Sequence, residues 1–411
     1  DLIRAAEDWS AETCLNADLD ALDPAAISLA RDRFASYHRD KSFGPDIGGW
    51  SDNVFLDRAK FTVQGKITRA CILLLGRPES RALLTPANAE IVWKLEGEER
   101  ANEFFHPPFL LTTSELYARI RNTIQKVDVP GRLVPYEVPK YDKWVILESL
   151  HNALAHQDYQ RQSRIVVTET VDELTIRSAG GFFDGCAADY MLGKQTPMRY
   201  RNKFLADAMV AVNMIDSMGY GIHRMFVEQR KRFYPLPDFA STTTDQVVVR
   251  IPGRVIDESY TALLMEKKDL PLETVILLDQ VQKGRDITRS EAAALRRAKL
   301  VEGRYPNLFV VATAAASPGE KARYIRNRAF DDRHFKELIL NYLRTYGHAS
   351  RTDLDELLIG KLSDVLTQDQ KLNKIRNLRK SLVEAGIICN AGSRKSPRWT
   401  LVHPPTAAPG K

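Results

Sequence analysis

The chain has 411 residues, with 59 Lys and Arg against 53 Asp and Glu, a formal net charge of +6 and 44% hydrophobic residues. This composition excludes a wholly disordered chain, and at roughly 100–200 residues per domain the length predicts two to four domains. No apolar run approaches the roughly 18 residues that a membrane span requires, and the first residues include acids where a signal segment would be apolar. We therefore expect a cytoplasmic protein without a membrane partner.

The positive charge is concentrated toward the C-terminus. Residues 321–400 contain 17 Lys and Arg against 9 Asp and Glu, so the rest of the chain is slightly acidic. A basic region on a near-neutral protein is typical of a nucleic-acid-binding module, although a solvated Lys-rich surface has the same balance. The four cysteines lie far apart, which excludes a CxxC metal motif and predicts reduced thiols.

Residues 1–135 are predicted to form a mixed α/β region that packs on the domain after it. Asp23 and Pro24 predict a helix start, because proline at the first helical position loses no hydrogen bond. The elements expected here are a helix over 24–38, a polar loop over 42–52, a turn and a short helix ending in a buried strand over 61–76, and a helix over 113–127.

Residues 136–255 are predicted to form an α+β domain. Apolar positions at helical spacing indicate a helix over 143–156, and two β-rich runs at 164–170 and 173–177 indicate a hairpin. The segment 182–200 has little signal of either kind. A helix over 203–215 and a strand over 246–251 complete the domain.

Two helix-rich repeats follow, at 256–320 and 321–405. The first has a helix from Leu272, a second over 290–299 with Thr288 as its N-cap, and a strand, but no clear third helix. We interpret it as a degenerate winged helix or linker. The second has helices over 332–346, 351–362 and 370–385 and a terminal hairpin, which is the plan of a winged helix-turn-helix domain.

The densest group of unusual polar residues lies in the predicted helix 143–156. Glu148 and Asn152 are four residues apart and share one face, which His156 extends. A carboxamide oxygen can ligate Mg²⁺, and a carboxylate can orient an attacking water. Taken alone, the pair is also compatible with an ordinary solvated helix face.

The order of motifs around this helix resembles the GHKL type of ATP-binding domain. Within that type it resembles the subgroup found in predicted transcriptional regulators and labelled as a helicase C-terminal relative. The subgroup pattern is E-x-x-x-N-A-x-x-H-R-D-Y, then N-P-G-G, R-N-P and I-E-x-x-G-T-G-I. The residues that match it are Glu148, Asn152, Ala153, His156, Asp158, Tyr159, Gly180, Gly181, Arg201, Asn202, Gly219, Gly221 and Ile222. The resemblance spans about residues 45–255 and continues into the winged helices.

The resemblance implies a GHKL-like α/β sandwich of the Bergerat type that binds ATP and Mg²⁺. It implies that Glu148 is the general base, that Asn152 is the magnesium ligand, and that glycine backbone approaches adenine and phosphates. Arg201 and Lys203 are implied to neutralise phosphate charge. The full set implied to bind nucleotide is Asn152, His156, Asp158, Gly180, Gly181, Arg201, Asn202, Lys203, Gly219 and Gly221.

The chain departs from this pattern at several positions. Ser178-Ala179 replaces Asn-Pro, Gln157 replaces Arg, and Lys203 replaces Pro. No Asp occupies the place from which wider GHKL enzymes hydrogen-bond adenine. Nucleotide preference and hydrolysis therefore stay open, and the absence of a G-x-x-x-x-G-K-[ST] loop argues against a helicase motor.

The helix predicted over 370–385 is basic on both sides of its apolar stripe, and the turn after it is basic too. Such a helix fits a major groove, with the hairpin as a wing on the DNA backbone. The residues predicted to contact DNA are Lys374, Arg376, Lys380, Arg394, Lys395 and Arg398. Winged helices also serve as dimerisation or protein-docking modules, which is the alternative.

These features predict a nucleotide-responsive, DNA-binding regulator of transcription, with double-stranded DNA and a second copy of the chain as partners. One alternative is an ATPase component of a nucleic-acid or anti-phage defence system, in which hydrolysis is the main activity. A further alternative is an oligomerising scaffold. Proteins with the resembling arrangement usually carry an upstream Schlafen-like AlbA-type domain, and because the sequence begins at Asp1 we expect such a domain outside it.

Overall fold

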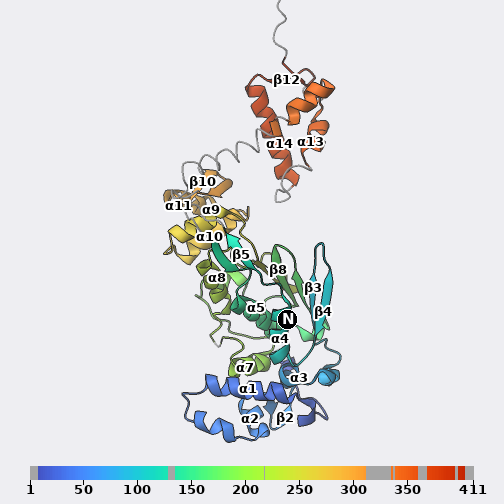
Figure 1. Ribbon diagram of the computed structural model, residues 1–411, viewed down its shortest axis with the longest axis vertical. Helices are drawn as coiled ribbons and strands as arrows, with labels where there is room; N and C mark the ends of the chain where they lie inside the picture. Colours follow the sequence, from blue (N-terminus) through green and yellow to red (C-terminus); the bar gives the residue numbers. More distant parts are fainter. Residues whose placement is uncertain are drawn as a thin grey trace, which may run out of the picture. The chain divides into compact units, whose positions relative to one another are not determined.

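The computed structural model describes residues 8–127, 135–216, 218–311, 335–336, 338–359, 368–393 and 397–402. The chain divides into two compact units, Asp1–Val311 and Ala312–Lys411, which are described separately below (Figure 1). Among the described residues, no helix has the length and apolar character needed to cross a membrane.

A five-stranded mixed sheet forms the centre of the first unit, with the strand order β4-β3-β7-β8-β9. The strands are β3 (Ile91–Leu95), β4 (Ala101–Phe105), β7 (Ile165–Glu169), β8 (Glu173–Ala179) and β9 (Gln246–Pro252). β3 and β7 are parallel, and the other neighbouring pairs are antiparallel. In β8, Leu174, Ile176 and Ser178 are buried while their neighbours are more exposed, so one face of the sheet is in the core.

Helices pack on that buried face. α4 (Phe109–Arg119) and α5 (Lys143–His156) contact the strands, and α7 (Lys203–Ala211) and α8 (Gly221–Lys231) pack on α5. α5 packs on β8 and contacts α4, α7 and α8, so it is the central helix of the layer. Asp142 begins α5 by accepting a hydrogen bond from the Val145 N–H at 3.0 Å. The expected helix 143–156 and hairpin 164–177 are both present, and the chain has the expected α+β class.

The region before the sheet shares one hydrophobic core with it, from Trp9 to Ile251. Asp8 and Ser10 accept hydrogen bonds from Phe204 N and Leu205 N at the start of α7, at 2.6 and 3.0 Å. The elements here are η1 (Trp9–Ala11), η2 (Leu19–Ala21), α1 (Pro24–Tyr37), η3 (Gly44–Gly49), α2 (Asp52–Arg58), β1 (Thr62–Val63), β2 (Lys66–Ile67), α3 (Arg69–Leu75) and η4 (Pro78–Leu84). These contacts hold the N-terminal region on the helical layer.

Two expectations in this region were wrong. The apolar run predicted as a buried strand is the helix α3, which Thr68 caps through the Cys71 N–H at 3.2 Å. A short, fully buried apolar run has no periodicity that separates helix from strand. The helix expected over 113–127 is α4, which ends at Arg119, and Ile124–Val127 is the strand β5, paired with β6 (Tyr136–Pro139). That pairing is a contact between separate segments, which local pattern does not reveal.

The first unit ends in a second, smaller helical core. It consists of α9 (Glu258–Glu266), α10 (Leu272–Gln282) and α11 (Arg289–Arg297), followed by the hairpin β10 (Val301–Arg304) and β11 (Asn307–Val310). The expectation that this repeat has no third helix was wrong, because α9 supplies it. Phe226 of α8 and Leu236 pack into this core, which joins it to the sheet domain.

The second unit has the predicted order of helices and hairpin. Residues 338–346 are helical, and α13 (Arg351–Ile359), α14 (Gln368–Glu384), β12 (Ile388–Asn390) and β13 (Trp399–Leu401) follow. Ile375, Leu378 and Leu382 of α14 are buried in its core, as their spacing predicts. β12 and β13 are antiparallel. The winged-helix assignment of this unit remains a prediction.

Candidate functional site

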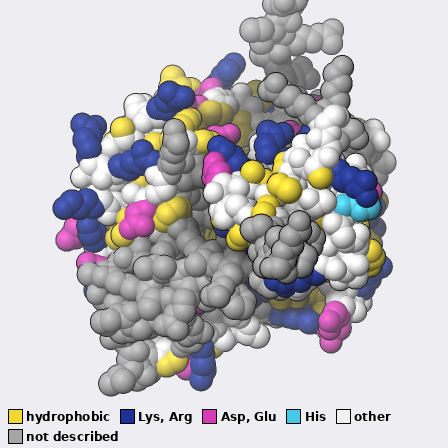
Figure 2. All heavy atoms as spheres, turned by 90° about the horizontal axis from the view of Figure 1, so that it is seen from above, with side chains coloured by type: hydrophobic (Ala, Val, Ile, Leu, Met, Phe, Trp, Pro, Cys, Tyr) yellow, Lys and Arg dark blue, Asp and Glu magenta, His cyan; other side chains and the backbone are white. Residues whose placement is uncertain are grey.

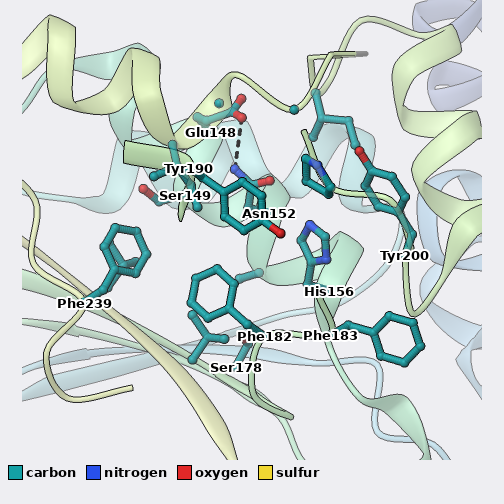
Figure 3. Close-up of a pocket in the computed structure, with 18 of the residues that line it drawn as sticks. Glu148, Ser149, Asn152, His156, Ser178, Phe182, Phe183, Tyr190, Tyr200 and Phe239 are labelled. Carbon is teal, nitrogen blue, oxygen red and sulfur yellow. Dashed lines mark hydrogen bonds between the residues drawn. The ribbon is translucent and has the colours of Figure 1, made fainter. Parts of the chain in front are cut away.

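A cavity of about 110 Å³ lies between α5, the end of β8, the segment after β8 and the start of α8. Figure 3 shows that Glu148 and Asn152 lie at one end, while Phe182 and Ser178 lie at the end near the sheet. The lining residues of interest are Glu148, Asn152, His156, Ser178, Gly181, Phe182, Tyr190, Arg199, Tyr200, Asp216, Gly219 and Gly221. The structure thus brings together residues separated by up to 73 positions in the sequence.

Glu148 and Asn152 meet the first residue of α8. The Asn152 Nδ2 donates a hydrogen bond to Glu148 Oε1 at 3.0 Å, as the dashed line in Figure 3 shows. A Cβ atom on Gly221 would lie 1.9 Å from the same Oε1, so only glycine fits there. No side chain caps the N-terminus of α8. Its first N–H groups and the positive end of its dipole are therefore next to the pair.

The turn before α8 is held by Asp216. Its Oδ2 accepts hydrogen bonds from Met218 N at 3.1 Å and from Tyr220 N at 2.9 Å. Gly219 has φ +73°, and a Cβ on it would lie 2.5 Å from Pro197 Cδ. The glycine therefore satisfies both a backbone conformation and a close approach. This turn fixes where α8 starts.

The Glu148 carboxyl group is buried, and burial raises its pKa to about 7. This value includes the Asn152 hydrogen bond, which lowers the pKa, the Asp216 charge, which raises it, and the Arg224 charge, which lowers it. A carboxylate with a pKa near neutrality is suited to accept a proton from water at physiological pH. Its environment therefore gives Glu148 the property that a general base needs.

His156 extends the row on α5, and its ring stacks on Tyr200 with centroids 5.7 Å apart. Burial, followed by the nearby Arg201 charge, lowers the pKa of His156 to about 4. The imidazole is therefore neutral at pH 7. In Figure 3 His156 and Tyr200 lie side by side between the two ends of the cavity.

The end of the cavity near the sheet is aromatic. The Phe182 ring stacks near Tyr190, with centroids 6.3 Å apart, and lies 6.2 Å from Phe239. Ser178, which stands where the family pattern has Asn, is 4% exposed and lines this end. Asp184 holds the segment in place, because it accepts hydrogen bonds from Met198 N and the Tyr190 hydroxyl, both at 2.7 Å.

Several predicted nucleotide ligands flank the cavity without lining it. Arg201 lies 3.3 Å from Asp158 and donates to Gly181 O at 3.2 Å, beside Gly180. Asn202 caps α5 by donating to Ala155 O and Gln157 O. Lys203 pairs with Asp207 at 2.8 Å. These side chains organise the walls of the site in this structure.

Several lining residues were not selected from the sequence, and Arg199 and Asp216 are two charged ones among them. Arg199 reaches the cavity from the segment after β8 and lies 3.8 Å from Asp184. Asp216 holds the glycine turn, and the only sequence signal for it was the acidic position of the I-E-x-x-G-T-G-I pattern. No sequence motif marked Arg199 as a site residue. The arginine predicted to pair with phosphate was Arg201, two residues away.

His151 and Ser149 have structural roles. His151 Nδ1 lies 2.8 Å from Met214 O and its Nε2 lies 3.3 Å from Thr113 Oγ1, which joins three segments of the core. Ser149 donates to Val145 O at 2.7 Å within α5. In the described residues, no cluster of three His, Cys, Asp or Glu side chains is arranged to hold a metal ion.

The chemistry of the lining residues fits a nucleotide that arrives with a divalent cation. Glu148, Asp184 and Asp216 line the cavity, with Arg199 as a cation among them. A polyphosphate beside these carboxylates requires Mg²⁺, which is commonly held by few protein ligands and by the phosphates themselves. The cavity is smaller than the roughly 300–1,000 Å³ of typical ligand sites. A nucleotide would therefore require the cavity to enlarge.

The residues predicted to contact DNA lie in the second unit. On α14, Arg376 and Lys380 are exposed, Lys380 lies 3.6 Å from Glu384, and the Lys374 Nζ lies 5.5 Å from the Phe335 ring centroid. Arg398 lies 3.1 Å from His348 Nδ1. Arg394 and Lys395 fall outside the described residues. On the coloured part of the face in Figure 2, Lys and Arg side chains are scattered among hydrophobic and acidic ones.

Comparisons with known proteins identify an ATPase-like segment. Residues 162–251 match the family described as "Putative ATP-dependent DNA helicase recG C-terminal", and residues 2–89 match a domain of unknown function, DUF8451. The first match includes the four glycines Gly180, Gly181, Gly219 and Gly221 and begins after Glu148 and Asn152. No curated protein matches the chain.

The fold is similar to that of a solved structure. It is the crystal structure of the DIP2311 protein from Corynebacterium diphtheriae, which is 19% identical in sequence, with a TM-score of 0.50. The similarity covers 96% of this chain and 70% of that chain. It concerns the fold alone. The chain therefore contains an ATPase-like domain in an α+β fold. Glu148 and Asn152 lie outside the matched segment.

The raised pKa of Glu148 predicts a pH-dependent stability. The folded chain keeps the Glu148 proton up to about pH 7, whereas the unfolded chain releases it near the ordinary value of 4.5, so the free energy of unfolding falls as pH rises between these values. Glu148→Gln replaces the ionisable carboxyl group with a neutral amide, so it removes this fall in the free energy of unfolding. We expect it to stabilise the protein by up to about 3 kcal/mol at pH 8 relative to its effect at pH 5, measured by urea unfolding. The exposed Glu115→Gln is the control, and an equal pH response of both variants would contradict the burial argument.

Proposed function

We propose that the chain is a nucleotide-responsive, DNA-binding regulator. In this proposal it binds ATP with Mg²⁺ in the cavity described above and binds double-stranded DNA through its second unit. The observation that carries the proposal is the meeting of Glu148 and Asn152 with the uncapped N-terminus of α8 at Gly221. The match of residues 162–251 to an ATPase-like family supports it.

Each group at the cavity has a chemical role in this proposal. Asn152 uses its Nδ2 on Glu148, which leaves its Oδ1 to ligate Mg²⁺. The N–H groups at the start of α8 hold phosphate oxygens, as helix N-termini do for anions. Where the bound nucleotide is hydrolysed, as in the second candidate below, Glu148 accepts the proton of a water that attacks the terminal phosphorus, while the bond to the bridging oxygen breaks. Arg199 balances phosphate charge from the segment after β8.

α8 offers a physical link between nucleotide and the rest of the chain. Its first residue, Gly221, lies against Glu148, and Phe226 lies in the core of α9–α11. A nucleotide that displaces the aromatic side chains of residues 182–200 and contacts the start of α8 would act on the Glu148 contact and, through α8, on the core of α9–α11. The proposal therefore includes a change in the helical core at 256–310 upon nucleotide binding.

An ATPase component of a nucleic-acid or anti-phage defence system remains the second candidate. The observation that favours it is the pKa of Glu148 near 7, which suits turnover better than mere occupancy. Binding without hydrolysis would favour the regulator, and steady hydrolysis would favour the ATPase.

The first test of the proposal is nucleotide binding. Asn152→Ala removes the proposed metal ligand and is expected to weaken binding of Mg²⁺-ATP about ten-fold or more in calorimetric titration. The exposed Asn53→Ala on α2 is a matched control and should bind like the wild type. Equal heats in wild type and Asn152→Ala would exclude this site.

Turnover decides between the two candidates. If Glu148 is the general base, kcat/KM for phosphate release from Mg²⁺-ATP should increase through about pH 7 as Glu148 of the free protein loses its proton, and Glu148→Ala should reduce it about a hundred-fold or more. The measurement is steady-state phosphate release between pH 5.5 and 8.5. A rate that Glu148→Ala leaves unchanged would assign the hydrolysis to another group.

DNA binding by the second unit is tested by changing α14. The triple variant Lys374→Ala, Arg376→Ala, Lys380→Ala is expected to lose about ten-fold or more in affinity for duplex DNA in a mobility shift near 0.15 M salt, with a weaker salt dependence. The control removes three exposed cations of the first unit instead, Arg39, Lys41 and Lys66. Full affinity in the α14 variant would show that duplex DNA binds elsewhere.

A further inference from the structure

The sheet has a second face, opposite the helices, that the nucleotide cavity does not use. The pairing register places Asn102, Lys94, Thr168, Thr175 and Arg250 in one row across the five strands. A parallel row consists of Phe104, Val92, Val166, Arg177 and Val248. We call this the outer sheet face. In Figure 1, α5 lies to the left of β3 and β4, and no described helix lies to their right.

Cations gather on the outer sheet face. They are Lys94, Arg100, Arg164, Arg177 and Arg250, and all five are exposed. Arg164 lies 3.3 Å from Glu90 and Arg250 lies 3.9 Å from Glu173. Within the described part of the chain, no ion pair includes Lys94, Arg100 or Arg177. The face therefore has cationic groups available for an anionic partner, although the first unit as a whole is not basic.

The β3–β4 end of this face is hollowed and includes an aromatic ring. A cavity of about 770 Å³ is lined by Lys94, Arg100 and Arg164, by one acid, Glu96, and by Phe104. The Phe104 side chain is 47% exposed, and the Arg164 guanidinium lies 5.6 Å from its ring centroid. An aromatic ring exposed beside several cations combines the two contacts that a nucleotide offers, a base to stack and a phosphate to pair.

We propose that the outer sheet face binds single-stranded nucleic acid. Val92 and Val248 are buried on this face, but its exposed cations extend from Arg100 beside β4 to Arg250 on β9. Five strands about 4.8 Å apart span roughly 19 Å, which is enough for several nucleotides. Phosphates would pair with Lys94, Arg100 and Arg177, and a base would stack on Phe104. A duplex keeps its bases stacked on one another, so it would gain nothing from the exposed ring, whereas a single strand does. A second copy of the chain would bring the same cations against each other, which disfavours a symmetric dimer on this face.

The proposed binding of single-stranded nucleic acid requires neither ATP nor the second unit. The test therefore distinguishes it from ATP binding and from DNA binding by the second unit. Binding of the full chain to a fluorescent oligo-dT of about 20 nucleotides is measured by anisotropy without ATP, at several salt concentrations. The variant Lys94→Ala, Arg100→Ala, Arg177→Ala is expected to bind about ten-fold or more weakly, with the slope of log affinity against log salt reduced by about 2. Phe104→Ala is expected to weaken binding about ten-fold by loss of stacking.

The Arg39→Ala, Lys41→Ala, Lys66→Ala variant removes equal charge from exposed positions away from this face and should bind like the wild type. The α14 triple variant should retain oligo-dT binding if the outer sheet face is the site. Photocrosslinking of bromouracil-substituted oligo-dT should modify peptides that contain residues 94–104. Three results would each overturn the proposal. The two triple variants of the first unit could lose oligo-dT affinity equally, or the crosslinks could be confined to the second unit. Phe104→Ala could also dissociate a dimer without any effect on oligo-dT binding.

Discussion

The contact between the Glu148 carboxyl group and the first residue of α8 determines the arrangement of the site. It requires glycine at position 221, it places the carboxyl group at the positive end of a helix, and it buries an ionisable group. Burial raises the pKa of Glu148 to about 7, so its charged and neutral forms are nearly balanced at neutral pH. A divalent cation beside it would favour the charged form. The protonation of Glu148 is thus sensitive to what binds in the cavity.

The same contact connects the cavity with the second core of the first unit. α8 is about 16 Å long at 1.5 Å per residue, and Phe226 packs among α9 and α10. A buried ion pair strengthens the junction: Lys283 lies 2.6 Å from Asp279, and both bond to the backbone of Leu236, at 2.7 and 2.9 Å. A displacement of α8 would disturb closely packed side chains at both ends, and packed cores tend to respond by discrete shifts.

The sequence predicted the parts of the fold and site that local pattern determines. Glu148 and Asn152 were found from their shared helix face, Gly221 was found from the resemblance to the GHKL motif order, and the structure brings the three together. β3 and β4 were missed because β3 pairs with β7, about 70 residues away, and β4 joins the sheet only through β3. Arg201 was selected for its charge, yet Asp158 and Gly181 engage it, whereas the irregular segment 182–200 delivers Arg199. Sequence shows charge but does not show which charges are already paired.

The alternation of β8 assigns neighbouring residues to different surfaces. Ser178 faces the nucleotide cavity, and Arg177, the residue before it, belongs to the outer sheet face. Only the thickness of one sheet therefore separates the proposed nucleotide from the proposed nucleic-acid strand. β8 is a central strand, hydrogen-bonded on both sides, so a local distortion at Ser178 is opposed by β7 and β9. A nucleotide would thus act on the outer face less by deforming β8 than by the charge it brings: its phosphates would strengthen the local negative potential, and Mg²⁺ would offset that effect.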